Sequence, residues 1–231
     1  MRLKDVIVAP EHEGKEKHVP HIEAPAKAKK GERFEVKVLR SFVRAADDEP
    51  ERGVDDLQRL TRRYRTDRGR TYGSGHGAMA YYYLGEAHRL QAEASPLTQV
   101  DDPAAARAQL NAKAEQILAA QDAYLQCIRT GERTYIPRAG LQLGGLYAGF
   151  RDDILTAAYP EGVETAEDRA IYDEILDEGT VVLLEKTRRV YEKVLDKATE
   201  VGLHDEYVIR LREGLKEVET ELIGDGPSAT L

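Results

Sequence analysis

From Gly75 to residue 222, apolar residues recur at the three- and four-residue spacing that is typical of α-helices. Asp102 followed by Pro103 marks a helix start, because the aspartate can cap the first turn and the proline fits within it. Thr165 with Asp168 gives a second start signal, a variant of the capping box. The pattern predicts five helices, over about 78–94, 103–129, 137–158, 166–201 and 205–222.

The first 45 residues follow a different pattern. Three prolines interrupt any long helix there: Pro10, Pro20 and Pro25. Residues 34–39 (FEVKVL) alternate apolar and polar, which predicts a strand, and residues 6–8 (VIV) suggest a second short one. Two short strands cannot bury a core. We therefore expect residues 1–45 to be a β or irregular arm that docks on the body or on another chain.

Between the arm and the helical body, residues 46–74 are rich in charge and glycine. We expect a linker there, with a short helix over about 54–64 followed by an exposed arginine-rich run. Residues 223–231 read as a frayed tail. The predicted fold class is mainly α, with a helical domain over 75–222 and a short N-terminal β or irregular arm.

Two segments of the helical body share a motif. The residues that carry it are Tyr81-x2-Leu84-Gly85-x2-His88 with Ala120-x3-Tyr124-x2-Cys127, and Leu143-Gly144-x2-Tyr147 with Thr187-x3-Tyr191-x2-Val194. This pattern resembles the tetratricopeptide repeat, a helix pair in which the glycine lets a neighbouring helix approach and the aromatic ring fills the gap.

The spacing departs from that family. Its repeat is 34 residues long, whereas Leu84 and Leu143 are 59 residues apart. The resemblance therefore implies extended helical hairpins, with the last helix as a polar cap. An unrelated antiparallel helix bundle is the alternative.

Residues 11–38 carry a second resemblance, through Glu16-Lys17-His18-Val19-Pro20-His21 and the stretch Lys29 to Val38. This segment is similar to the opening of the superoxide reductase (desulfoferrodoxin, neelaredoxin) iron domain. The resemblance implies that Glu16 occupies the sixth iron position, that Lys17 attracts superoxide, and that His18 is an equatorial iron ligand.

The remaining ligands of that family are missing from this sequence. No histidine follows Val38 before His76, and the lone cysteine, Cys127, lies on a predicted helix, where we expect a packed core thiol. Three histidines of the arm could still bind zinc, iron or nickel with neighbouring glutamates, or be part of a solvated segment: His12, His18 and His21.

The net charge of −8 is unevenly distributed, with about +4 in residues 1–70 and about −12 in the rest. An acidic body opposes nucleic-acid binding, because phosphates are repelled. The arginines between residues 59 and 70 are expected to pair with acidic surface. No apolar run is long enough for a membrane span or fit for a signal peptide, so we expect a cytoplasmic protein.

These observations favour a protein–protein interaction or assembly subunit, in a homo- or hetero-oligomer, over an enzyme. No cofactor and no catalytic residue is assigned to it. The candidate contact residues are four tyrosines: Tyr82, Tyr83, Tyr147 and Tyr172. The alternative is a superoxide-reductase-related non-haem iron protein that uses Glu16, Lys17 and His18 and takes its other ligands from a second chain.

Overall fold

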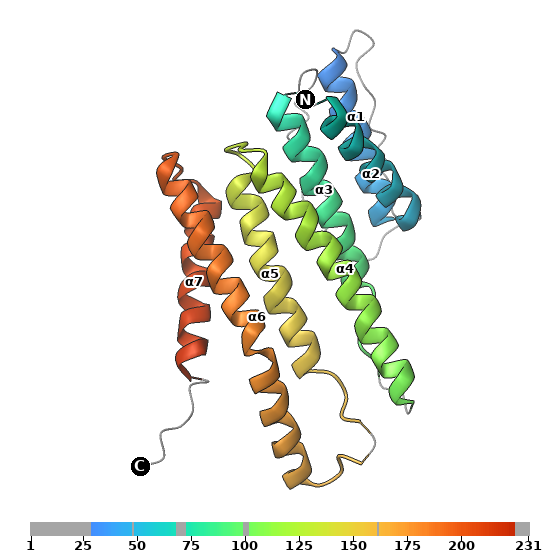
Figure 1. Cartoon of the computed structure of the whole chain (residues 1–231), viewed down its shortest axis with the longest axis vertical. Coiled ribbons are helices and arrows are strands. Elements are labelled where there is room, and N and C mark those ends of the chain that lie inside the picture. Colours follow the sequence, from blue (N-terminus) through green and yellow to red (C-terminus); the bar gives the residue numbers. More distant parts are fainter. Residues whose placement is uncertain (1–28, 48, 68–72, 99–101, 161, 225–231) are drawn as a thin grey trace, which may run out of the picture.

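The computed structural model describes residues 29–47, 49–67, 73–98, 102–160 and 162–224. All secondary-structure elements in this part are α-helices (Figure 1). They are α1 (Lys30–Ala46), α2 (Pro50–Asp67), α3 (Gly73–Glu93), α4 (Pro103–Arg129), α5 (Ile136–Leu155), α6 (Ala166–Glu200) and α7 (Glu206–Gly224).

The helices form three successive pairs, α1 with α2, α3 with α4 and α5 with α6, and α7 packs on the last pair (Figure 1). Each second helix also contacts the first helix of the next pair. In addition, α1 contacts α3 and α5 contacts α7. The chain is thus a stack of helix pairs in which neighbours in sequence are neighbours in space.

The predicted strand over 34–39 is wrong, because these residues lie within α1. Phe34, Val38 and Ala45 are buried on one side of this helix, at spacings of four and seven residues. Val36, about 200° from Phe34 around the helix, is buried as well, because α1 packs against both α2 and α3. The sequence over 34–39 therefore alternates although the segment is helical. The backbone groups of residues 34–39 are therefore bonded within α1 and are not available for strand pairing.

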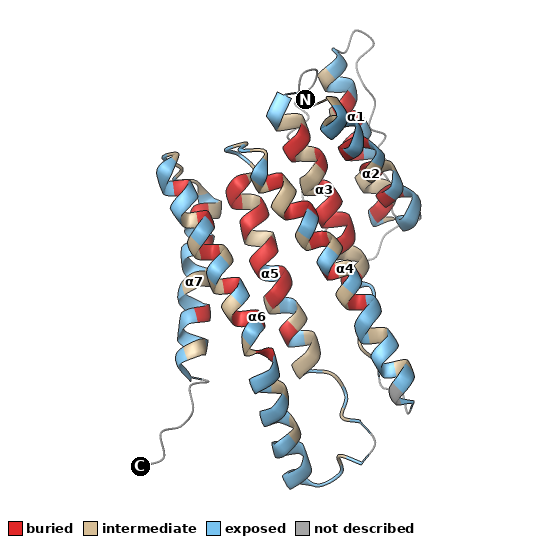
Figure 2. Cartoon of the chain, in the orientation of Figure 1, coloured by how far each residue is buried: buried red, intermediate tan, exposed pale blue. Residues whose placement is uncertain are grey.

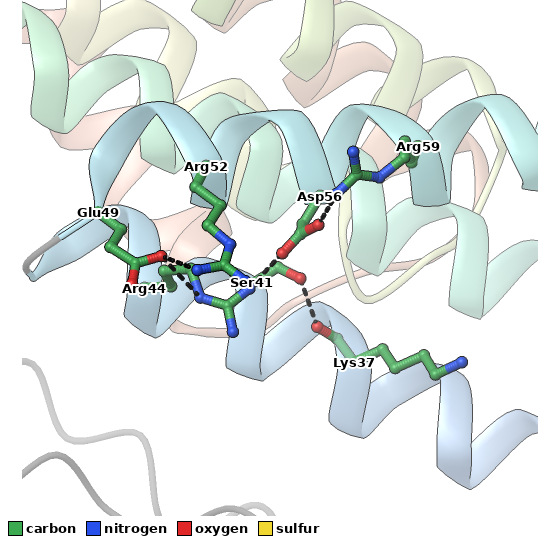
Figure 3. A network of polar contacts seen from close by, with 7 residues as sticks. All are labelled: Lys37, Ser41, Arg44, Glu49, Arg52, Asp56 and Arg59. Carbon is green, nitrogen blue, oxygen red and sulfur yellow. Dashed lines mark hydrogen bonds and ion pairs between the residues drawn. The ribbon is translucent and has the colours of Figure 1, made fainter.

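Helix α2 is longer than the short helix expected over 54–64, and it forms a true pair with α1. Val54 and Leu57 are buried between the helices. A chain of ion pairs then joins their exposed edges (Figure 3). Its members are Arg44, Glu49, Arg52, Asp56 and Arg59. Arg59, the first arginine of the run, is thus paired with Asp56 of α2 itself rather than with the acidic body.

In the next two pairs, a glycine faces a tyrosine ring as the repeat pattern predicts. A Cβ added to Gly85 on α3 would lie 2.6 Å from Cε1 of Tyr124 on α4. A Cβ on Gly144 of α5 would likewise overlap the ring of Tyr191 on α6. The predicted close approach of the helices at these glycines is confirmed.

Several predicted helix ends are also confirmed. The Asp102 carboxylate accepts a hydrogen bond of 3.0 Å from the Ala104 N–H at the start of α4. Thr165 and Asp168 form a complete capping box at the start of α6. Helix α3 begins at Gly73, earlier than predicted.

Helix α6 has 35 residues and its partner α5 only 20. The first turns of α6 extend beyond the end of α5 and are exposed (Figure 2). Helix α7 buries Val208, Leu211 and Val218, and its other face is mostly polar apart from the exposed Ile209 and Ile223. The buried Arg151 of α5 ties this end together through ion pairs with Asp177 and Glu221.

Candidate interaction surface

The first helices of the pairs bring five polar or aromatic side chains together, which we call the tyrosine–arginine cluster. Its members are Tyr82, Tyr83, Tyr135, Arg138 and Tyr207. Tyr82 of α3 is the centre, with ring centroids 5.4 Å from Tyr83 and 5.5 Å from Tyr135 at the start of α5. Aromatic pairs at this separation attract each other beyond simple burial. The cluster therefore links α3, α5 and α7 across three structural units.

Arg138 is the cationic member of the cluster. Its guanidinium carbon lies 4.7 Å above the ring of Tyr207 and 6.0 Å from that of Tyr135. Both distances are in the range of a cation–π contact, which holds the guanidinium plane against the rings. The Nε atom is buried and has no hydrogen-bond partner within the described part of the chain. No described carboxylate forms an ion pair with Arg138, so the charge is held in place without a counter-ion.

Burial keeps the tyrosines of the cluster neutral at ordinary pH. It raises the pKa of Tyr83 to about 12, an effect that the Arg138 charge partly offsets. Burial is also the main cause of the raised pKa values of Tyr82 and Tyr135. The nearby Gln142 side chain partly offsets the rise in the pKa of Tyr82. The cluster thus combines rigid neutral rings with one fixed cation.

This combination of side chains is common at surfaces where proteins bind one another. Tyrosine and arginine are the residues that dominate protein interfaces, because they offer large contact area and several donors at small entropic cost. An arginine fork can donate two parallel hydrogen bonds to a carboxylate. Tyr82, Tyr135, Arg138 and Tyr207 are all half-buried, so that each retains surface for contact.

The structure separates the four tyrosines that the sequence suggested as contacts. Tyr82 lies in the cluster and keeps a minor part of its surface exposed, whereas Tyr83 lies beside it and is only 8% exposed. Tyr147 is buried in the core between α4 and α5, where its hydroxyl donates to Gln121 at 2.7 Å. Tyr172 stands apart on the first half of α6 and packs against the Tyr159 ring at 5.8 Å.

Three members of the cluster were missed at the level of sequence: Tyr135, Arg138 and Tyr207. Tyr135 and Arg138 flank the start of α5, and Tyr207 lies in the first turn of α7. Each of the three lies in the first helix of a structural unit or immediately before it. This shared position is the sequence signal that could have revealed them.

Cys127 is a buried core thiol, as predicted. It donates a hydrogen bond to the Ala78 carbonyl at 3.3 Å, and burial raises the pKa of the thiol well above its usual range. Among the described residues no group of three or more His, Cys, Asp and Glu side chains is arranged to hold a metal ion. The predicted metal and catalytic residues of the arm lie outside the described residues: His12, Glu16, Lys17, His18 and His21.

The chain matches no family model, no curated protein and no solved structure. The class of this protein is therefore described by its fold and by the surface given above. The described part of the chain is an all-helical stack of paired helices with one face that carries aromatic rings and a cation. None of the helices in the described ranges combines the length and the apolar character needed to cross a membrane.

Proposed function

We propose that this protein is an interaction or assembly subunit that binds a segment of a partner protein at the tyrosine–arginine cluster. The observation that carries the proposal is Arg138, a half-buried cation stacked on Tyr207 with no carboxylate from the described chain beside it. The buried Nε–H of Arg138 lacks an acceptor, and an unsatisfied buried donor costs about 1–3 kcal/mol. A partner carboxylate would remove that cost on binding.

We also propose that the helical body is built like a tetratricopeptide array. Three pairs are present where such arrays usually need at least three. Each glycine of the motif accommodates the aromatic ring of its partner helix, as between Gly85 and Tyr124. In this proposal the first helices present the binding face and α7 closes the end of the stack.

A photo-crosslinking experiment in the native source tests the binding face. We would place p-benzoylphenylalanine at Tyr207 in the cluster and, as a control, at the exposed Thr220 near the other end of α7. We expect a defined protein adduct from position 207 that is lost when Arg138→Ala is added, and no such adduct from position 220. Equal adducts from both positions, or adducts that survive Arg138→Ala, would contradict the proposal.

The N-terminal arm is proposed to help in docking, and the structure decides how to test this. A deletion of residues 1–45 would remove α1, whose Phe34 and Val38 belong to the core. The deletion should therefore end at residue 28. We expect the partner to be lost or weakened when residues 1–28 are removed, and full retention of every partner would refute the docking role.

The iron-protein alternative gains no support from the described residues. The part of that resemblance over 29–38 lies in α1, and Cys127 is buried in the helical core. The segment with Glu16, Lys17 and His18 lies outside the described residues. Metal analysis of the purified full-length chain tests this alternative directly, since bound iron with a visible charge-transfer band would restore it.

A further inference from the structure

The first half of α6 carries exposed apolar side chains that no described residue covers. Ile171, Ile175 and Val182 are 53%, 61% and 50% exposed. At 100° per residue they fall within a sector about 40° wide, and they extend over about three helical turns. The sector lies opposite Thr180 and Thr187, which are buried. These side chains therefore form one outward stripe rather than scattered exceptions.

Glutamates line one edge of this stripe. Glu167, Glu174 and Glu178 lie about 20 to 60° from it around the helix. All three are exposed, and none forms an ion pair with another described residue. Between residues 166 and 178 the helix carries one basic and six acidic residues: Arg169, and Glu167, Asp168, Asp173, Glu174, Asp177 and Glu178. The stripe is thus apolar with a strongly negative border.

We propose that this stripe binds a basic amphipathic helix of a partner protein. Two helices pack when apolar rows interdigitate along a seam, and flanking charges decide which partners are allowed. Lysine or arginine beside the partner's apolar row would face the free glutamates, and this complementarity would also speed association. A second copy of this chain fits poorly, because pairing of identical stripes would bring the glutamates against one another.

This surface is distinct from the tyrosine–arginine cluster. The stripe lies on the first half of α6, whereas the cluster lies on α3 and at the starts of α5 and α7. The inference therefore stands or falls independently of the proposed function.

A peptide-binding assay tests it with the full-length chain. The probe is a fluorescent designed helix of about two heptads, with a leucine row flanked by lysines. The matched peptide has glutamate in place of each lysine. We expect the lysine peptide to bind at least about tenfold more tightly than the glutamate peptide, and to weaken as salt screens the charges. Absent or equal binding of the two peptides would overturn the proposal.

Variants then locate the site. The double variant Ile171→Ser/Ile175→Ser should reduce lysine-peptide affinity about tenfold or more, since about 1.4 kcal/mol corresponds to that factor. Glu174→Lys/Glu178→Lys should reverse the preference between the two peptides. Ile209→Ser on α7 is the matched control, because Ile209 is also 53% exposed. Circular dichroism confirms folding, and a control as damaging as the double variant would overturn the assignment.

Two further measurements identify the occupant. Sedimentation of the free chain tests for self-association, and loss of a dimer in Ile171→Ser/Ile175→Ser would replace the proposed partner with a second copy. Deletion of residues 1–28 tests for an occupant in cis. If the lysine peptide bound only after that deletion, the chain's own N-terminal segment would be the occupant, and the proposal would be wrong.

Discussion

Replacement of Gly85 by alanine gives the sharpest test of how the helix pairs are held together. In an exposed helix position, glycine to alanine raises stability by about 1 kcal/mol, because alanine restricts the unfolded chain and favours the helix. At Gly85 the new Cβ would lie 2.6 Å from Cε1 and 2.7 Å from Cδ1 of Tyr124. Ordinary carbon contacts are about 3.5–4.0 Å, so the ring must move by about 1 Å.

The ring has little room to move. Tyr124 is fully buried, and its hydroxyl donates a hydrogen bond of 2.6 Å to the buried Glu86. Overpacking in such a site costs about 1–3 kcal/mol. Complete loss of the Tyr124–Glu86 hydrogen bond would cost about 1.5–3 kcal/mol more, and a weakened bond would cost part of that. After subtraction of the helix gain, we expect Gly85→Ala to lower the free energy of unfolding by about 2 kcal/mol.

Urea denaturation followed by circular dichroism measures this change. Gly145→Ala on α5 is the control, because Gly145 is exposed and nothing lies within 4 Å of its added Cβ. We expect the control to raise stability by about 1 kcal/mol, so the two variants should differ by about 3 kcal/mol. If Gly85→Ala were as stable as Gly145→Ala, the close packing of α3 on α4 would not be what requires glycine.

Two predictions concern ionisation. The Cys127 thiol is buried with a raised pKa, so we expect a disulfide reagent such as DTNB to react with it only after urea unfolds the chain; fast reaction of the native chain would refute this. Burial raises the pKa of Tyr83 and Tyr147 to about 12, above the unfolded value of about 10. Between these values the unfolded state releases protons that the folded state keeps, so stability should fall as pH rises above about 10. Absorbance at 295 nm should then report the ionisation of Tyr83 and Tyr147 together with the loss of the circular dichroism signal of the helices. Ionisation of these two tyrosines near pH 10 in a chain that is still folded would contradict the reasoning.

The sequence predicted much of the helical body because the deciding interactions are local. The cap at Asp102 and the capping box at Thr165 depend on residues two or three positions away. The burial of Cys127 was expected from its place in the repeat motif on a predicted helix. The strand predicted over 34–39 failed because α1 packs against both α2 and α3 and therefore buries residues on more than one of its sides. Phe34 and Val36 lie about 200° apart around the helix and are both buried, which in the sequence looks like alternation.

The binding surfaces could be predicted only in part. Tyr82 stood out as one of three consecutive tyrosines, but nothing in the sequence shows that Tyr135, Arg138 and Tyr207 approach it. Those contacts join α3, α5 and α7, and they depend on the angles and distances between helix pairs. The exposure of Ile171 and Ile175 likewise depends on where α5 ends relative to α6.

The sequence alone determined three things: the class of the fold, the approximate helix ends from α3 onward, and the pairing of glycine with aromatic positions within the hairpins. These features follow from the 3.6-residue period and from local hydrogen bonds. The tertiary structure decided that the N-terminal segment over 30–46 is a helix and that Tyr83 and Tyr147 face the core. It also decided that Arg138 lies stacked on Tyr207. The physical reason is that burial and cation–π contact depend on distances between elements far apart in sequence, and those distances are set by the packing of whole helices.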